Sequence, residues 1–451
     1  MLRSKALLKG GYVRNLIGLA LLFTITACSH TATQPEQQAA ANQETKVCDL
    51  PYTKFQSTVT GYCQEVAAEL PKTIPSETLT LEFRPVEQIP EVFWFNQKLA
   101  YTLNQQPNSA PLAFVIAGTG AAHDSPKMKT LQKTLFSQGY HVVSLSSPTY
   151  PNYIINATTR DDMVGDLAKD AKSLYAKMSA IYEQLQSSHN VEATSFSLTG
   201  YSLGGAHSAF ISQLDEEAKV FNFEKVVLIN PPVSLYNSVQ ILDGYLDLEY
   251  NRPAAVAMVD RIFDRLAEQY ALQESSELSQ ESIYSLFAGA KMTEQELKLL
   301  IGASFRMSSA DMMFAIDATY NIGALIYKNH DISKFESITH SMHRADDITF
   351  TRYFDRHMLP WTQKLEPNVT RDDMIERLSL VAIEDYLKSA EKVTVVTNQD
   401  DIILAEGEVD YLREVFGARA QIFERGGHCG NMDRHSFVEY MRGQFVGAST
   451  L

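Results

Sequence analysis

The chain has 451 residues, with 39 Lys and Arg against 54 Asp and Glu, so its formal net charge is −15 at pH 7. So acidic a chain repels the phosphate backbone of nucleic acids, and neither a basic stripe nor an RNA-binding motif appears. We therefore exclude nucleic acid as a partner. No HExxH or CxxC spacing occurs, so the sequence implies no metal site and no cofactor.

The N-terminus has the plan of a bacterial export signal. Four basic residues lead into an apolar run, 16–25, that is too short to span a membrane in the usual way. Residues 25–28, Ile-Thr-Ala-Cys, resemble the bacterial lipobox, which implies cleavage before Cys28 and acyl chains on that cysteine. Ser29 follows, and by the same resemblance this favours the outer membrane, facing the periplasm. The alternative is an ordinary cleaved signal, 1–27, with a chance cysteine.

The segment behind the signal contains a tether and two neighbouring cysteines. Residues 28–47 are rich in Thr, Gln and Ala without apolar periodicity, so we expect a flexible tether. Cys48 and Cys63 stand at the start of the folded part, where an oxidising periplasm favours a disulfide between them. Cys429 is then left over, and we expect it to be a packed small residue.

Strand and helix patterns alternate through the first half of the chain. Apolar runs rich in residues that favour strands predict buried strands at 112–117, 140–145, 193–199 and 225–229. Ser125 and Pro126 predict a helix start, and apolar positions from Met163 to Leu185 recur at helical spacing. This alternation predicts an α/β fold with a mostly parallel sheet and helices on both faces.

Residues 200–204, Gly-Tyr-Ser-Leu-Gly, join the strand at 193–199 to a helix-like stretch. A strand that turns abruptly into a helix strains its turn residue and lifts the Ser202 hydroxyl above the sheet. Small neighbours are needed because larger side chains would collide with the adjacent strand or helix. The Leu203 N–H, at the helix N-terminus, then points at a developing oxyanion. The alternative is that these residues form a glycine-rich turn in an α/β fold that does not use a serine in this way.

A serine nucleophile needs a base, and the base needs an orienting acid. For this kind of turn the expected chain order is Ser, then Asp or Glu, then His, each on a loop after a late strand. The β-branched run 392–397 leads to Asp400 and Asp401. The predicted last strand, 420–423, is followed by two glycines and His428.

With these motifs in this order, the chain resembles the α/β-hydrolases. The resemblance implies that fold, with Ser202 as nucleophile and His428 as base. It favours Asp401 as the acid, because the second member of a paired Asp-Asp usually has this role, and it leaves Asp400 as the alternative.

The resemblance also implies that the loop after strand 112–117 gives a second oxyanion donor beside Leu203. Thr119 or Gly120 would supply it through a backbone N–H. The His-Gly motif that is common there is absent. A rival interpretation as a nucleotide-phosphate cradle lacks the full G-x-G-x-x-G pattern, since its last position is His123, a residue that could instead touch substrate.

Roughly 160 residues separate the strand at 225–229 from the one at 392–397, far beyond a normal connection. Thr-x-x-Glu at 293–296 and Thr370 with Asp373 are helix-start signals. The family inserts caps at this point, so we expect a helical cap at 233–390 between core segments 48–232 and 391–451. The sequence favours its apolar cluster, 305–316, as cap core over a lipid-accepting pocket.

These observations predict a lipid-anchored serine hydrolase of the cell envelope. A Ser-His-Asp triad would cleave an ester-type small molecule or a lipid-like substrate through an acyl-enzyme, as an esterase or lipase does. The alternative function is that of a non-catalytic envelope lipoprotein, which uses the same scaffold to bind a ligand or a partner.

Overall fold

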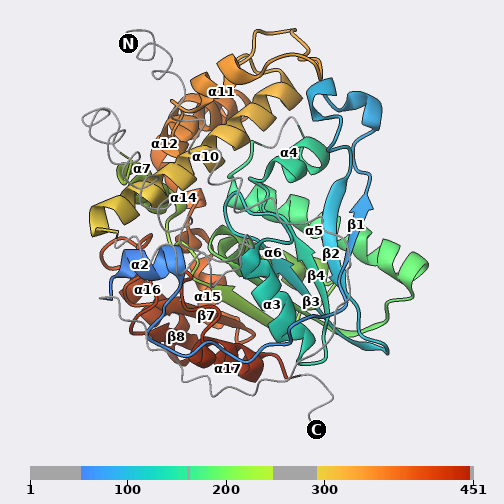
Figure 1. Ribbon diagram of the computed structural model, residues 1–451, viewed down its shortest axis with the longest axis vertical. Helices are drawn as coiled ribbons and strands as arrows, with labels where there is room; N and C mark the ends of the chain where they lie inside the picture. The colour runs from blue at the N-terminus through green and yellow to red at the C-terminus, as the bar shows by residue number, and fades with distance from the viewer. Residues whose placement is uncertain (1–51, 160–162, 247–291, 447–451) are drawn as a thin grey trace, which may run out of the picture.

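The computed structural model describes residues 52–159, 163–246 and 292–446. At its centre lies one eight-stranded sheet, drawn as arrows in Figure 1. The strands are β1 (Glu77–Leu81), β2 (Leu99–Asn104), β3 (Ala110–Ile116), β4 (His141–Leu145), β5 (Ala193–Tyr201), β6 (Lys225–Ile229), β7 (Val393–Asn398) and β8 (Ala420–Phe423).

The strand order across the sheet is β1-β2-β4-β3-β5-β6-β7-β8. The six strands from β3 to β8 are parallel, which confirms the predicted arrangement. Strands β1 and β2 pair antiparallel with each other, and β2 pairs antiparallel with β4. The sequence reasoning missed these two, and β1 is an edge strand that is largely exposed.

Helices connect the strands and cover both faces of the sheet. Before β7 the core helices are α2 (Lys54–Thr60), the short η1 (Val86–Gln88) and η2 (Glu91–Phe93), α3 (Pro126–Phe136), α4 (Pro151–Ala157), α5 (Leu167–His189) and α6 (Leu203–Ala218). After β7 they are α16 (Glu408–Phe416), η5 (Gly417–Arg419) and α17 (His435–Gln444).

Alternate residues of β3 serve two separate cores. Leu112, Phe114 and Ile116 pack with α5, α6 and α16 on one face of the sheet. Ala113 and Val115 pack with α3 and α17 on the other. All residues of β3 are buried, as expected for a strand covered on both faces.

Helix α5 begins later than the apolar periodicity predicts. The Asp166 side chain accepts a hydrogen bond from the Lys169 N–H and caps the helix, which starts at Leu167. Just before it, Gly165 has a φ of +104°, a conformation that no helix tolerates. Met163 therefore lies outside the helix and packs with the helices above the sheet.

All the named elements that are described between β6 and β7 are helices. They are α7 (Leu235–Gly244), α10 (Glu294–Tyr320), α11 (Thr339–Ala345), α12 (Phe350–Tyr353), the π-helix η3 (Phe354–Met358), α13 (Leu359–Leu365), α14 (Arg371–Arg377), η4 (Leu380–Ile383) and α15 (Glu384–Ser389). Capping boxes at Thr293 and Thr370 start α10 and α14, as the sequence predicts.

Helices α10, α11 and α12 lie at one end of the molecule, beyond the carboxyl ends of the parallel strands (Figure 1). They share a hydrophobic cluster with α4 and with Ile89 and Phe93. The last two helices, η4 and α15, pack instead against the sheet, through Leu380 and Leu387. We call the packed helices from α7 to α14 the cap.

Helix α10 is, among the described residues, the one helix long and apolar enough to cross a membrane by those two criteria. More than half of its apolar stretch is buried inside the protein. Met313, Phe314 and Ile316 belong to the cap cluster, as the sequence favours. We interpret α10 as the central helix of the cap.

Candidate active site

Ser202 lies at the sharp junction between β5 and α6, where its backbone is strained. Its φ of 55° and ψ of −126° fall in a region that L-residues rarely adopt. The junction depends on close backbone approach: a Cβ on Gly200 would lie 2.3 Å from the Gly204 carbonyl oxygen. A Cβ on Gly204 would lie 2.2 Å from the carbonyl oxygen of Ile116 on β3. Both glycines are thus needed for the turn that exposes Ser202.

The structure brings together the three residues that the sequence selects as a triad. His428 Nε2 lies 2.9 Å from Ser202 Oγ. On the other side of the ring, His428 Nδ1 lies 3.0 Å from Asp401 Oδ1 and 3.1 Å from Asp401 Oδ2. These contacts join loops that follow β5, β7 and β8, at the carboxyl edge of the sheet. The geometry is that of a nucleophile, a base and an orienting acid.

The two neighbouring aspartates have different partners. Asp401 is buried and faces the His428 ring, whereas Asp400 Oδ1 accepts a hydrogen bond from the Gly427 N–H at 3.0 Å. Burial raises the pKa of the Asp400 carboxyl, although the hydrogen bond from Gly427 opposes this. Asp401 is therefore the residue placed to orient the imidazole, while Asp400 holds the loop that carries it.

Asn230 is a site residue that the sequence reasoning missed. It follows β6 directly, has a φ of 44°, and donates from Nδ2 to Asp401 Oδ2 at 2.8 Å. The Ile403 N–H donates to Asp401 Oδ1 at 3.1 Å. These two bonds fix the carboxylate in front of the imidazole. An asparagine at the end of a parallel strand is the signal that could have found it.

The charge of Asp401 controls the protonation of His428. Burial is the largest single effect on the pKa of the imidazole and lowers it, but the charge and hydrogen bond of Asp401, together with those of Cys429, raise it by more. The pKa of His428 therefore lies above its ordinary value. An imidazolium formed by taking a proton from Ser202 would be stabilised in this position.

Of the two candidate N–H groups in the loop after β3, one is already engaged. The Gly120 N–H donates to Thr149 Oγ1 at 2.8 Å. No described residue accepts a hydrogen bond from the Thr119 or Leu203 N–H, and both residues line the cavity beside Ser202. A Cβ on Gly118 would come within 3.0 Å of Ser202 Cβ, so this loop runs directly past the serine. Leu203 and Thr119 are thus the two candidate donors whose N–H groups no described residue engages.

Helix α2, near the N-terminus, supports the His428 loop from outside. The His428 N–H donates to Thr58 Oγ1 at 2.9 Å. A Cβ on Gly427 would lie 2.2 Å from the Lys54 carbonyl oxygen, and one on Gly430 would lie 2.1 Å from that of Ser57. The loop therefore fits against α2 only because it contains glycines. Sequence reasoning missed this contact, which joins residues 370 positions apart.

The same helix also contacts the cap and the loop that carries Asp401. The Phe55 ring packs with Leu297 of α10 and with Ile402 and Ile403. Cys63, three residues after α2 ends, is disulfide-bonded. Its expected partner, Cys48, lies outside the described residues, as does Cys28, so that pairing stays a prediction.

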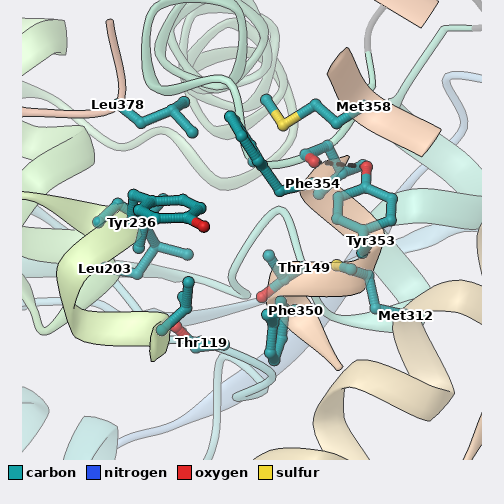
Figure 2. A pocket seen from close by; sticks show the side chains of 14 residues that line it. Thr119, Thr149, Leu203, Tyr236, Met312, Phe350, Tyr353, Phe354, Met358 and Leu378 are labelled. Carbon is teal, nitrogen blue, oxygen red and sulfur yellow. Dashed lines mark hydrogen bonds between the residues drawn. The ribbon is translucent and has the colours of Figure 1, made fainter. Parts of the chain in front are cut away.

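A narrow apolar cavity lies next to Ser202, between Thr119 and Leu203 on one side and cap residues on the other. Its volume is about 40 Å³. Figure 2 shows Thr119, Leu203 and Tyr236 facing the cap residues Phe354 and Tyr353 across this space. Other lining residues include Val239, Met312, Phe350 and Met358. Since typical ligand sites have about 300–1,000 Å³, these side chains must move to admit a ligand.

Two further histidines near the site have partners away from Ser202, whereas Cys429 Sγ lies 3.9 Å from His428 Nε2. His123 is buried, with its Nδ1 2.7 Å from Thr102 Oγ1, and it does not line the cavity. His207 is fully buried on α6 and lies 3.4 Å from Asp170 Oδ2. Cys429 is free and buried, as the sequence predicts for a packed small residue. Within residues 52–159, 163–246 and 292–446, no group of three or more His, Cys, Asp or Glu could hold a metal ion.

The strand order, the strained serine between β5 and α6, and the succession of Ser, Asp and His define an α/β-hydrolase fold. No family model and no curated protein matches the chain.

Among solved structures, the chain is similar to an esterase from the archaeon Pyrobaculum calidifontis, at 12% identity and a TM-score of 0.38, over 83% of this chain and 84% of that one. It is also similar to brefeldin A esterase, a bacterial homologue of human hormone-sensitive lipase, at 14% identity and a TM-score of 0.40. That match covers 86% of this chain and 81% of the esterase. A thioesterase domain from the curacin biosynthetic pathway matches at 11% identity and a TM-score of 0.36. That match covers 82% of this chain and 99% of the domain.

We predict that replacing Asp401 by Asn lowers the pKa of His428. The carboxylate raises that pKa, and its removal leaves the opposing effect of burial. The imidazole would then lose its proton at a lower pH in the variant than in the wild type. NMR titration of the protein with isotope-labelled histidine measures this shift.

Asp400→Asn is the matched control, because it removes a neighbouring charge that does not face the ring. If the two variants shift the pKa of His428 equally, or neither shifts it, then Asp401 does not control the imidazole.

Proposed function

We propose that this protein is a serine hydrolase that cleaves ester-type substrates through an acyl-enzyme. The observation that carries the proposal is the pair of contacts on the His428 ring, 2.9 Å from Nε2 to Ser202 Oγ and 3.0 Å from Nδ1 to Asp401 Oδ1. A binding protein needs neither a base against the serine nor an acid behind the base.

In the first half of the reaction, Ser202 Oγ attacks the ester carbonyl carbon while His428 Nε2 takes its proton. Asp401 keeps Nδ1 protonated and stabilises the imidazolium. The Leu203 and Thr119 N–H groups donate to the oxyanion of the tetrahedral intermediate. His428 then returns the proton to the alkoxide, the ester C–O bond breaks, and the alcohol leaves.

In the second half, water replaces the alcohol. His428 removes a proton from the water as its oxygen attacks the acyl carbon. The tetrahedral intermediate collapses, Ser202 Oγ leaves with the proton from His428, and the carboxylic acid is released. No step requires a metal or a cofactor.

The cavity supports an ester with an apolar acyl group. Leu203 and Thr119, the proposed oxyanion donors, line it, so an acyl carbon held by them would lie against this cavity. Its walls are aromatic rings, Met side chains and aliphatic groups. Met312 and Met358 are flexible enough to widen it for an acyl chain.

The alternative is a non-catalytic lipoprotein that uses this scaffold for binding. The observation in its favour is the volume of the cavity, about 40 Å³, which holds little more than water. The experiment on ester hydrolysis therefore decides between the two.

We predict that the purified protein hydrolyses p-nitrophenyl esters, and that Ser202→Ala lowers kcat by at least about 1,000-fold, because no other group in the site replaces the nucleophile. Steady-state rates on acetate, butyrate and octanoate esters measure this and locate the preferred chain length.

The kcat values of the Asp401→Asn and Asp400→Asn variants provide an internal comparison. Loss of the orienting acid lowers kcat by about 10⁴-fold in the well-known triad, so Asp401→Asn should be severe. Asp400→Asn keeps an oxygen that accepts the Gly427 N–H and should lose far less. Equal rates in the wild type and Ser202→Ala would favour the binding protein.

We further propose that the enzyme is anchored in the bacterial envelope by lipid on Cys28. The lipobox-like residues 25–28 support this, and the polar stretch behind them suits a tether. Cys28→Ser in the full chain should move the protein from the membrane fraction to the soluble fraction of expressing cells. Unchanged membrane association of that variant would contradict the anchor.

A further inference from the structure

A second cavity lies within the cap, apart from Ser202. Its volume is about 320 Å³, in the range of small-molecule sites and well above that of the apolar cavity. It is lined by Ala324, Leu325, Arg344, Asp347, Ile348, Arg352, Arg356 and His357. None of these residues lines the cavity beside Ser202.

The charge of this second cavity is opposite to that of the chain. Three arginines line it, Arg344, Arg352 and Arg356, with one carboxylate residue, Asp347. The chain as a whole carries a formal charge of −15. Because like charges on the rest of the surface repel an anion, a positive recess is where an anion would be held.

The neighbouring loop holds one of these arginines in place. The buried Asp317 carboxylate accepts hydrogen bonds from four successive N–H groups, those of residues 323–326. The loop folded in this way offers its Ala324 and Leu325 carbonyl oxygens to Arg344, at 2.7 and 3.0 Å. Arg344 therefore makes two hydrogen bonds to the wall, and a guanidinium has five N–H donors.

The other two arginines come from neighbouring turns. Arg352 Nη1 donates to the Asp347 backbone oxygen at 2.7 Å. Arg356, one turn further, makes no hydrogen bond or ion pair with any described residue. Planar guanidinium groups bind the oxygens of phosphate groups in pairs, so a cluster of them suits a phosphate group.

The π-helix Phe354–Met358 forms a wall of both cavities. Its Phe354 and Met358 side chains line the apolar cavity, whereas Arg356 and His357 line the basic one. π-helical turns are rare and are often found at functional sites. A ligand bound to Arg356 would therefore contact the same turn that shapes the acyl cavity.

We propose that the basic cavity of the cap binds a phosphate group, independently of the reaction at Ser202. The phosphate oxygens accept hydrogen bonds from Arg352 and Arg356, with Arg344 and His357 completing the site. The group belongs either to a soluble phosphate compound or to the headgroup of a membrane lipid, and both sources have the same chemistry. This inference does not require the proposed hydrolase activity.

The test is isothermal titration calorimetry of inorganic phosphate into the full chain carrying Cys28→Ser, so that no lipid anchor contributes. Saturable binding is expected, and Arg352→Gln and Arg356→Gln should each weaken it by about tenfold or more, since a hydrogen bond to a charged group contributes about 1.5–3 kcal/mol. Lys172→Gln, an equal loss of charge on an exposed position of α5, should leave it unchanged.

Flotation with vesicles distinguishes the two sources. Binding to phosphatidylglycerol vesicles that Arg356→Gln abolishes would assign a lipid headgroup, and phosphate binding without flotation would assign a soluble compound. Arg356 is exposed, so its variant should fold even if Arg352→Gln does not. The proposal is wrong if the folded protein shows no saturable phosphate binding, or if Arg356→Gln binds phosphate as the parent does.

Discussion

The close approach of α6 to β3 at Gly204 is the contact on which the site depends. With the carbonyl oxygen of Ile116 in the place where a Cβ would stand, the chain can turn from β5 into α6 within a single residue. That turn forces Ser202 into its strained conformation and leaves its hydroxyl above the sheet. The parallel strands β7 and β8, which lie beyond β6 on one side of β5, bring their own following loops to the same edge, which is why Asp401 and His428 meet there.

The residues that the sequence identified are those with local signals. The turn at 200–204 has two obligatory glycines. The strand-like runs 392–397 and 420–423 end shortly before Asp401 and His428. The helix starts at Thr293 and Thr370 also depend on side chains only three residues apart. Such features could be predicted because the chemistry and the spacing lie within one short segment.

What the sequence did not reveal depends on contacts between distant segments. Strands β1 and β2 are short, and β2 joins the sheet by pairing antiparallel with β4, a contact between segments about 40 residues apart that no local pattern marks. Thr58 reaches the His428 loop across 370 positions, and no local pattern marks it. The apolar periodicity placed the start of α5 too early. Met163 is apolar because it packs against the cap, and it does not belong to the helix. The choice between Thr119 and Gly120 needed the position of the Thr149 hydroxyl.

The cap combines two recesses of opposite character around one π-helical turn. The apolar recess next to Ser202 is narrow, so access to the serine depends on how the cap side chains move. The basic recess has the larger volume and shares that turn with the apolar one. One turn of the cap thus contributes side chains both to the recess next to Ser202 and to a second recess that none of the residues lining the first one shares.

The central claim is that Ser202 is an activated nucleophile. Treatment of the folded protein with a fluorophosphonate, followed by intact-mass and peptide mass spectrometry, tests it most directly. The account predicts one phosphonyl group on the peptide that contains Ser202, and no labelling of Ser202→Ala. A folded wild-type protein that takes up no label, or takes it up on another residue, would contradict the account.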